Sequence, residues 1–352
     1  MPTIAAVSKI DLPYKVQQQQ VKDYALQLFS TDFPLVQKLS GIFDNTEIVS
    51  RNLCKPLNTY ADSRAFEDNN KDYIRFALQY AIEAIEACLV ATNISKDDVT
   101  DIIFVSSTGL ATPSLDALIV NQMKLNPHIN RMGVFGLGCA GGVSGMAKAN
   151  ALAKANPDAI VLLVAVELCS LTFLRNDYSK SNFVASSLFS DGIAASIVLG
   201  DNHKPQQQVS FVASGSKLYY DTLDVMGWEF LDTGFKVIFS QDIPTIIRKY
   251  VQGDVISFLS KNGLELSDIK NFIFHPGGKK VLQAYTEAFD MDTDFLKITR
   301  ETMNSYGNMS SATVLYVLQH FLENGYEDGY GLMVAMGPGF SSEMVLLKMT
   351  KN

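Results

Sequence analysis

The segment Gly133–Ala147 contains residue types that could perform nucleophilic chemistry. An apolar run leads into a turn crowded with glycines, Cys139 follows the turn, and small residues typical of a closely packed helix come next. A thiol at a helix N-terminus lies beside free backbone N–H groups and the positive end of the helix dipole, which favour the thiolate. The turn therefore predicts a nucleophile. The alternative is a buried structural cysteine, because free cysteine is among the most buried residue types.

Two other segments contain candidate partners for Cys139. Among the four histidines, His275 alone ends an apolar strand and precedes a Pro-Gly-Gly turn, where a ligand can approach the backbone closely. Asn308 lies in a Tyr-Gly-Asn-Met-Ser-Ser segment before a second helix that opens in small residues. In such a set His275 would hold Cys139 as a thiolate, and His275 and Asn308 would donate hydrogen bonds to a thioester carbonyl as negative charge develops. The alternatives are a structural histidine and an asparagine that caps a helix.

An internal duplication predicts that these three residues converge. Cys139 comes 34 residues after Val105 (139 − 105), and Asn308 comes 33 residues after His275 (308 − 275). Val105 and His275 end similar apolar strands, each strand follows an amphipathic helix, and a second buried strand closes each unit. The paired segments are the helices at 72–92 and 243–262, the strands at 98–105 and 268–275, and the closing strands at 159–166 and 331–336. Duplicated units usually pack face to face, so equivalent turns would meet near a pseudo-twofold axis. Chance self-similarity is the alternative.

The composition fits a large globular protein. The chain has 352 residues, of which 47% are hydrophobic and 19% charged, and we expect a cysteine-bearing half at 1–205 and a half bearing His and Asn at 206–352. A net charge of −8 without a Lys/Arg cluster argues against nucleic acid as a ligand. No signal-like N-terminus and no run of roughly 20 apolar residues occurs, so we expect no membrane span and a cytoplasmic protein. Four scattered cysteines without a CxxC pair indicate neither a metal site nor a disulfide framework.

Several short strings in the chain resemble one known family. They are Val-Ser-Ser107-Thr-Gly-Leu-Ala-Thr112-Pro113, Gly138-Cys139-Ala-Gly-Gly, Ser187-Leu-Phe189-Ser-Asp191-Gly, His275-Pro-Gly-Gly, Tyr-Gly-Asn308-Met-Ser-Ser and Gly337-Pro338-Gly339-Phe-Ser-Ser-Glu343. Their order and contexts resemble the type III polyketide synthases, the chalcone synthase-like branch of the thiolase superfamily, and among these the bacterial alkylpyrone synthases. The resemblance implies an α/β protein with the five-layered αβαβα thiolase-like fold, built from two duplicated halves, that works as a homodimer without a metal or redox cofactor.

The resemblance also implies roles for individual residues. Cys139 would accept the acyl group from an acyl-CoA starter, and His275 and Asn308 would promote decarboxylation of malonyl-CoA and stabilise the enolate. Phe189 would separate the CoA tunnel from the cavity, and Thr112 would reach into the cavity of the neighbouring subunit. The expected substrate-binding residues are Phe189, Ser107, Thr112, Cys169, Thr172, Val237, Ser310, Pro338 and Gly339. Because several of these are smaller than in plant enzymes, a medium- or long-chain fatty acyl starter and an alkylpyrone or alkylresorcinol product are expected.

The residues expected to bind CoA depart from the family pattern. Lys38 matches one basic position, but the other two are occupied by Gly41 and Asn45. Lys55 and Lys280 are possible replacements, and the residues we assign to CoA binding are Lys38, Arg51, Gly277, Gly278 and Lys279. Because an arginine that grips phosphate with two donors is not readily replaced, delivery of the starter by an acyl-carrier protein is the alternative.

Two other functions share the same residues. A carrier-protein-dependent initiation condensing enzyme, similar to ketoacyl synthase III, would also use Cys139, His275 and Asn308. The His-Pro-Gly-Gly, Gly-Asn-Met-Ser-Ser and Gly-Pro-Gly contexts favour the polyketide branch. A non-catalytic thiolase-fold subunit that binds acyl groups is the third hypothesis, and the intact set of three residues argues against it.

Overall fold

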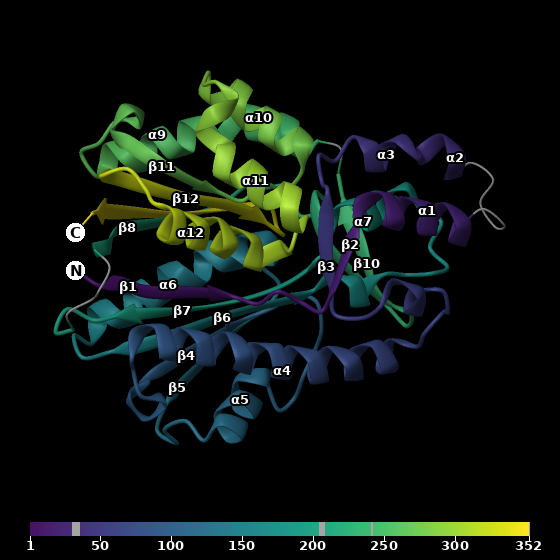
Figure 1. Ribbon diagram of the computed structural model, residues 1–352. Coiled ribbons are helices and arrows are strands. Elements are labelled where there is room, and N and C mark those ends of the chain that lie inside the picture. Colours follow the sequence, from purple (N-terminus) through teal and green to yellow (C-terminus); the bar gives the residue numbers. More distant parts are fainter. Residues whose placement is uncertain (30–35, 204–207, 241, 352) are drawn as a thin grey trace.

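Five layers of secondary structure make up the protein (Figure 1). The computed structural model describes residues 1–29, 36–203, 208–240 and 242–351, without the side chains of Gln37, Lys38 and Gln208. From top to bottom in Figure 1, helices α9–α11, a sheet, helices α6 and α12, a second sheet, and helices α4 and α5 follow one another. The expected αβαβα architecture is confirmed.

The strands repeat one topology in the two halves. The two sheet layers are continuous in strand order, β11-β12-β13-β8-β1-β7-β6-β4-β5, and a single pair of residues, Thr3 and Ser210, joins β1 of one layer to β8 of the other. In both halves a parallel pair (β4–β6, β11–β12) is followed by antiparallel partners (β7 then β1, β13 then β8). The bounds are β1 Thr3–Lys9, β4 Asp101–Val105, β5 Asn130–Val134, β6 Ile160–Leu168, β7 Asp191–Leu199, β8 Gln208–Leu218, β11 Ile269–Phe274, β12 Gly329–Gly337 and β13 Ser341–Thr350. The strands paired by the sequence analysis, β4 with β11 and β6 with β12, are therefore topological equivalents.

Helices cover both outer faces and fill the middle layer. The longer helices are α1 Gln18–Phe29, α4 Phe66–Thr92, α5 Leu115–Met123, α6 Gly141–Ala155, α7 Lys180–Leu188, α9 Gln252–Lys261, α10 Lys279–Phe289, α11 Lys297–Tyr306 and α12 Thr313–Asn324. The helix expected at 72–92 begins six residues earlier, at Phe66, and its buried stripe includes Cys88 as expected. No helix among the described residues is long and apolar enough to cross a membrane.

In the middle layer two helix backbones come into direct contact. Helices α6 and α12 lie between the two sheets and share one hydrophobic core with residues of both. A Cβ atom on Gly142 would lie 2.2 Å from the backbone oxygen of Ser311, so the two helix starts approach more closely than any other residue type allows. The small residues that open both helices are thus explained by contact between backbones.

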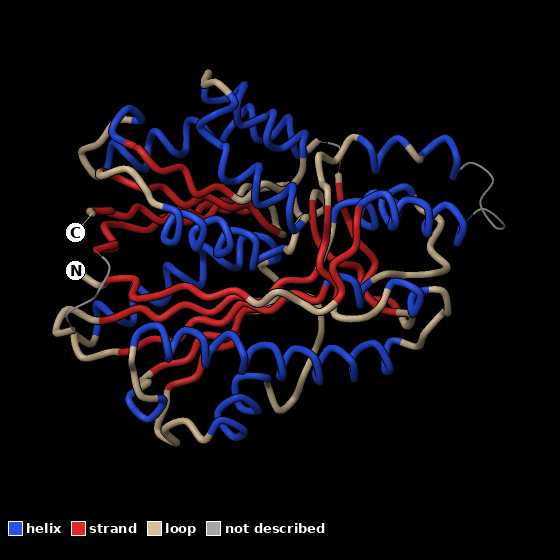
Figure 2. Tube along the Cα trace, viewed as in Figure 1, coloured by secondary structure: helices blue, strands red, loops and turns tan. Residues whose placement is uncertain are grey.

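A side module extends from one end of the layers (Figure 2). It combines α1 and α7 with two small antiparallel sheets, formed by β2 Tyr14–Gln17 with β3 Ser50–Leu53 and by β9 Met226–Leu231 with β10 Gly234–Phe239. Two short helices, α2 Val36–Leu39 and α3 Gly41–Asp44, complete it. Its own core contains Phe29, Phe43 and Phe183. This module forms the walls of the cavities described below.

Candidate active site

Cys139 lies in a short 3-10 turn, Gly138–Ala140, that runs directly into α6. Gly138 has a φ of +45°, and a Cβ there would lie 2.7 Å from the ring of Pro338, so glycine is required by both conformation and space. The Gly138 N–H donates to Ser107 Oγ over 3.0 Å. The predicted turn before a helix is confirmed, and the Cys139 side chain is buried within it.

Asn308 approaches the sulfur from the second half of the chain. Its Oδ1 lies 4.0 Å from Cys139 Sγ, and the Ser310 hydroxyl lies 3.8 Å from the same sulfur. Backbone groups orient the amide, because the Ser310 N–H donates to Asn308 Oδ1 over 2.9 Å and Asn308 Nδ2 donates to the Gly277 carbonyl over 2.9 Å. One of the two N–H bonds of the amide is thus used, and the other can serve a substrate oxygen.

His275 is linked to Asn308 through the backbone of the turn that follows it. Its backbone N–H extends the β11–β12 pairing to the Val334 carbonyl over 2.8 Å, and two residues later the Gly277 carbonyl accepts the bond from Asn308. The imidazole is buried, and neither ring nitrogen has a hydrogen-bond partner among the described residues. A buried unpartnered imidazole is costly unless a ligand completes its bonds.

Burial opposes isolated charges in this site. It raises the pKa of Cys139 to about 12, with the hydrogen bonds between the thiol and Ser310 and Asn308 acting in the other direction. It also lowers the pKa of His275 to about 3. Both groups are therefore neutral at pH 7 on their own, contrary to the thiolate expected from the helix N-terminus alone. A proton moved from the thiol to the imidazole would create two opposite charges together, each stabilising the other.

Glu167 is a site residue that the sequence analysis missed. Its fully buried carboxylate accepts bonds from Ser107 N over 3.1 Å and from Ser311 Oγ over 2.6 Å, which ties the loop after β4 to the turn before α12. Burial raises its pKa to about 7 despite these hydrogen bonds. One signal was available, since Glu167 is the single charged residue in the otherwise apolar strand β6.

An apolar cavity under α1 collects four of the nine expected substrate-binding residues. Cys169, Thr172, Phe189 and Val237 all line it. Further walls come from α1 and from the aromatic residues of the small β9–β10 sheet, including Trp228 and Phe235. Phe189 also forms a β-bridge with Asn308, so this cavity begins beside the residue that contacts Cys139.

The other expected substrate-binding residues have different positions. Ser107 and Ser310 lie at the cysteine turn, and Pro338 packs on that turn against Gly138. Gly339 follows with a φ of +74°. Thr112 is exposed on the loop between β4 and α5 and lines none of the described cavities.

A second cavity, the basic mouth, contains most of the residues expected to bind CoA. Gly277, Gly278 and Lys279 line it, together with Lys180 and Lys280. Lys279 also pairs with Glu47 over 3.3 Å. The side chain of Lys38 lies outside the part of the chain that is described. Helix α7 separates the two cavities, because Leu188 lines the basic mouth and the next residue, Phe189, lines the apolar cavity.

The assignment of Arg51 to CoA binding is wrong. Its side chain is only 2% exposed and lies under α7, where one guanidinium nitrogen donates to the carbonyls of Ser186 and Phe189 over 2.7 and 2.8 Å. The arginine thus caps the C-terminal end of α7, where a cation is favoured by the helix dipole. The local sequence around Arg51 gives no indication that its side chain contacts α7, which lies far along the chain. Lys55 likewise lies away from the basic mouth and pairs with Asp72 over 2.8 Å.

Comparison with known proteins identifies the family. The chain matches the N-terminal domain of chalcone and stilbene synthases over residues 2–202 and their C-terminal domain over residues 212–350. The chain belongs to this family of type III polyketide synthases. The Bacillus subtilis (strain 168) protein named "Putative chalcone synthase" is 41% identical, with 96% of each chain covered. The 1,3,6,8-tetrahydroxynaphthalene synthase of Streptomyces peucetius subsp. caesius is 34% identical, with 98% of this chain and 93% of the relative covered.

Solved structures agree with the family assignment. The synthase superposes on the crystal structure of 1,3,6,8-tetrahydroxynaphthalene synthase from Streptomyces coelicolor A3(2), a bacterial type III polyketide synthase. The TM-score is 0.94 at 28% identity, covering 99% of this chain and 100% of the other. The synthase is therefore an acyltransferase of the chalcone synthase-like kind, and the hypotheses of a non-enzymatic subunit and of an initiation condensing enzyme give way to it.

Proposed function

We propose that this synthase condenses a medium- or long-chain fatty acyl-CoA starter with malonyl-CoA units and cyclises the product to an alkylpyrone or alkylresorcinol. The observation that supports a fatty acyl starter is the apolar cavity. Four of the residues that line it were expected to contact the starter, and it begins at Phe189, which is bridged to Asn308. Aliphatic and aromatic walls of this kind favour an acyl chain over a polar starter.

Loading of the starter uses the coupled proton transfer described above. Cys139 gives its proton to His275 and the thiolate attacks the acyl-CoA carbonyl. The bond between that carbonyl and the CoA sulfur breaks, and CoA leaves as a thiol with the proton held by His275. Cys139 then carries the acyl group as a thioester, and the neutral imidazole has one N–H available as a donor.

Extension uses His275 and Asn308 as donors. The free N–H bonds of the two side chains bind the thioester oxygen of malonyl-CoA. The bond to the carboxylate breaks, CO₂ leaves, and the electron pair becomes an enolate whose charge these donors stabilise. The enolate carbon attacks the acyl carbonyl on Cys139, the sulfur leaves, and a ketoacyl-CoA extended by two carbons results. No step of this reaction requires a metal or a redox cofactor.

The basic mouth is the proposed entrance for CoA. It has a volume of about 380 Å³, and its inner wall includes Gly277 and Leu188, whose carbonyls accept bonds from Asn308. Lys180 and Lys280 are exposed at its edge, where the family positions at Gly41 and Asn45 lack charge. If CoA delivers the starter, a charge-removing double substitution of the two lysines should raise KM for acyl-CoA about tenfold and leave kcat little changed. An unchanged KM would favour an acyl-carrier protein.

A homodimer is proposed from the open edge of the sheet. Strand β5 pairs on one side only, with β4, and an unpaired edge strand is a template for pairing with a second chain (Figure 2). Phe135, directly after β5, is 48% exposed and stacks on exposed Phe230. A second copy of this chain would cover these residues and bring its exposed Thr112 loop to the same face. Phe135→Glu should therefore shift the mass measured by light scattering from dimer to monomer.

The proposed function has a direct test. Purified protein is incubated with malonyl-CoA and saturated acyl-CoA starters of increasing length, and products are identified by mass spectrometry. Triketide or tetraketide pyrones or resorcinols are expected, with the highest kcat/KM for medium or long chains. Turnover of malonyl-CoA alone, as in self-condensation, would contradict the fatty acyl starter while leaving the family intact. Cys88→Ala is the matched control for Cys139→Ala, because Cys88 is also buried but lies within helix α4.

A further inference from the structure

A third cavity adjoins the outer end of the apolar cavity. This polar cavity has a volume of about 320 Å³, and charged side chains such as Lys55, Arg64 and Lys236 line it. Tyr60, Ser170 and Phe173 line both the apolar cavity and the polar cavity. These three side chains therefore form the partition between them.

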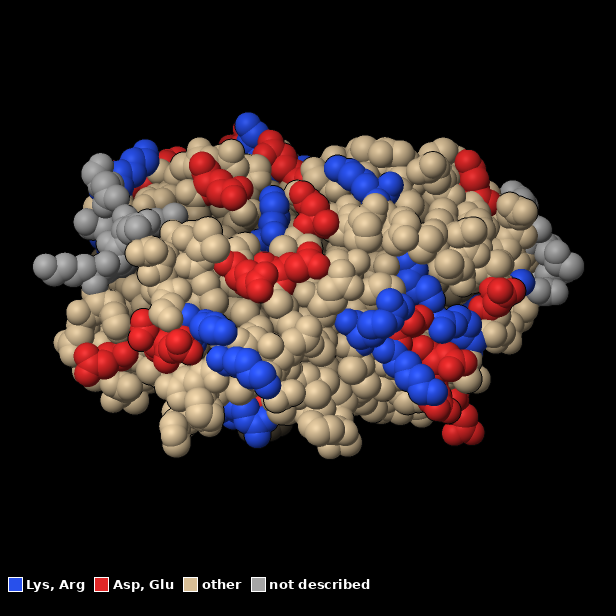
Figure 3. Space-filling view, turned by 60° about the horizontal axis from the view of Figure 1, so that its bottom comes forward, with Lys and Arg blue, Asp and Glu red and all other residues tan. Residues whose placement is uncertain are grey.

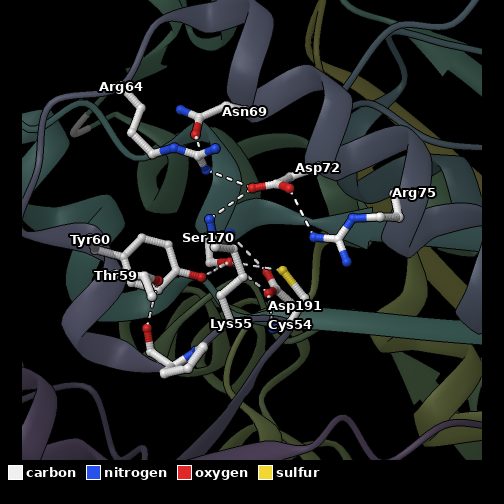
Figure 4. A network of polar contacts seen from close by, with 11 residues as sticks. Cys54, Lys55, Thr59, Tyr60, Arg64, Asn69, Asp72, Arg75, Ser170 and Asp191 are labelled. Atoms are coloured by element: carbon white, nitrogen blue, oxygen red, sulfur yellow. Dashed lines mark hydrogen bonds and ion pairs between the residues drawn. The ribbon is translucent and has the colours of Figure 1, made fainter.

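One hydrogen bond holds Tyr60 in the partition (Figure 4). Its hydroxyl donates to Ser170 Oγ over 2.6 Å. Ser170 itself is fixed, because its N–H and hydroxyl donate to the fully buried carboxylate of Asp191 over 2.7 and 2.6 Å. Tyr60 ends a short 3-10 turn, Leu57–Tyr60, and is only half-buried. A single bond between hydroxyls contributes about 1 kcal/mol, so the tyrosine ring can swing away while Ser170 stays in place.

The lining of the polar cavity has more basic than acidic side chains: Lys55, Arg64, Arg175 and Lys236 against Asp62 and Asp177. At one wall Lys55 Nζ and Arg64 NH1 pair with Asp72 behind the lining, over 2.8 and 2.6 Å, and Arg75, outside the cavity, pairs with the same carboxylate over 2.9 Å. Burial alone would raise the pKa of Asp72, but the hydrogen bonds from Lys55, Arg75 and Arg64 hold it well below its usual range. In Figure 3 basic side chains gather around acidic ones at the end of the molecule that carries the side module. An anionic oxygen would complete the charge balance of this wall.

We propose that Tyr60 is a removable boundary inside one extended acyl site. The apolar cavity holds the methylene chain, and the polar cavity receives the far end of the chain when that end carries a carboxylate, which Lys55 and Arg64 bind. The proposal rests on the proposed function. It makes Tyr60 a residue that determines starter specificity, since with the partition closed a charged chain end would lie against apolar walls.

The test compares two starters of equal length in several variants. The starters are dodecanoyl-CoA and the mono-CoA thioester of dodecanedioic acid, and kcat/KM for each is measured with malonyl-CoA. Tyr60→Ala removes the partition, and Tyr60→Phe keeps the ring but loses the bond to Ser170. Tyr24→Ala is the matched control, because Tyr24 lines only the apolar cavity. Thermal unfolding establishes that each variant is folded.

Tyr60→Ala should raise kcat/KM for the diacid thioester relative to dodecanoyl-CoA about tenfold, and Tyr60→Phe about threefold. Adding Lys55→Met to Tyr60→Ala should cancel the gain. Tyr24→Ala should leave the ratio unchanged. An unchanged ratio in both Tyr60 variants, or a gain that survives Lys55→Met, would overturn the inference. Should Tyr60→Ala fail to fold, the Tyr60→Phe ratio decides. Failure of the wild-type protein to extend dodecanoyl-CoA would instead contradict the proposed function.

Discussion

The two turns that meet at the active site share a backbone design and differ in chemistry. In each, a glycine with positive φ, Gly138 or Gly307, leads into a buried 3-10 turn that opens a central helix. The first turn presents the thiol of Cys139, and among the described residues its side-chain hydrogen-bond partners, Asn308 and Ser310, come from the second turn. The second presents the amide of Asn308, which backbone groups hold at both ends.

The difference between the two turns reflects the different roles of a nucleophile and a hydrogen-bond donor. A nucleophile must be free to change its bonds, so Cys139 has only long contacts to Asn308 and Ser310. A donor that stabilises developing charge must be held rigidly, because reorganisation during the reaction would cost the energy it supplies. The glycines and the close backbone approach are common to both copies, whereas the residue after the glycine sets the role of each.

The largest effect should come from removing the two side chains separately. Cys139→Ala should abolish condensation, because no thioester can form. Asn308→Ala should still load the starter but slow decarboxylation of malonyl-CoA by 10²–10³-fold, as expected for loss of one oxyanion donor. Rates of CO₂ release and of acyl transfer to the protein distinguish the two. Equal loss of loading in both variants would mean that the turns do not have separate roles.

Stability should reveal the close contact between the two turns. Gly142→Ala places a Cβ against the Ser311 carbonyl, which cannot move without shifting α12, and should lower the free energy of unfolding by about 3 kcal/mol. Gly253→Ala is the control, because this glycine lies within α9 with nothing within 4 Å of the added atom. It should stabilise by roughly 0.5–1 kcal/mol. Urea unfolding measures both, and a Gly142→Ala protein as stable as wild type would contradict the packing.

Two buried groups, Glu167 and His275, should make the free energy of unfolding depend on pH in opposite directions. Glu167 has its pKa raised from 4.5 to about 7, so the folded protein binds more protons than the unfolded chain and stability falls as pH rises through that window. His275 has its pKa lowered from 6.5 to about 3, so stability falls as pH drops through that window. Glu167→Gln should therefore gain stability over wild type as pH rises, and His275→Gln as pH falls. Unfolding curves between pH 4 and 7 test this, and parallel curves for all three proteins would contradict it.

The smallest effect is expected at Arg51, which caps the C-terminal end of α7. Arg51→Lys keeps the charge but loses the guanidinium nitrogen that donates to both carbonyls, and should cost about 1–2 kcal/mol of stability. Arg248→Lys, at an exposed pair with Glu287, should cost less than about 0.5 kcal/mol. Thermal unfolding compares them. Similar small losses would mean that the cap on α7 contributes little.

The sequence predicted the parts of the site that belong to the internal duplication. It did not predict contacts that a side chain makes only in the folded chain. The duplicated strands and turns predicted that Cys139 and Asn308 meet, because topology fixes where equivalent turns lie. Arg51 was misassigned, since a lone basic residue in a short strand gives no indication that its side chain turns inward to cap a helix more than a hundred residues away. Tyr60 carried no signal, because its role as a partition depends on two cavities that exist only in the folded chain.

The central claim is that one thiol, at the meeting point of the two turns, carries the acyl group. It is tested most directly by incubating the protein with a long-chain acyl-CoA in the absence of malonyl-CoA and locating the acyl group by peptide mass spectrometry. The account predicts one acyl group per chain, on Cys139, although all four cysteines are buried and Cys169 lines the apolar cavity. Acylation of Cys169 in place of Cys139, or no acylation at all, would contradict it.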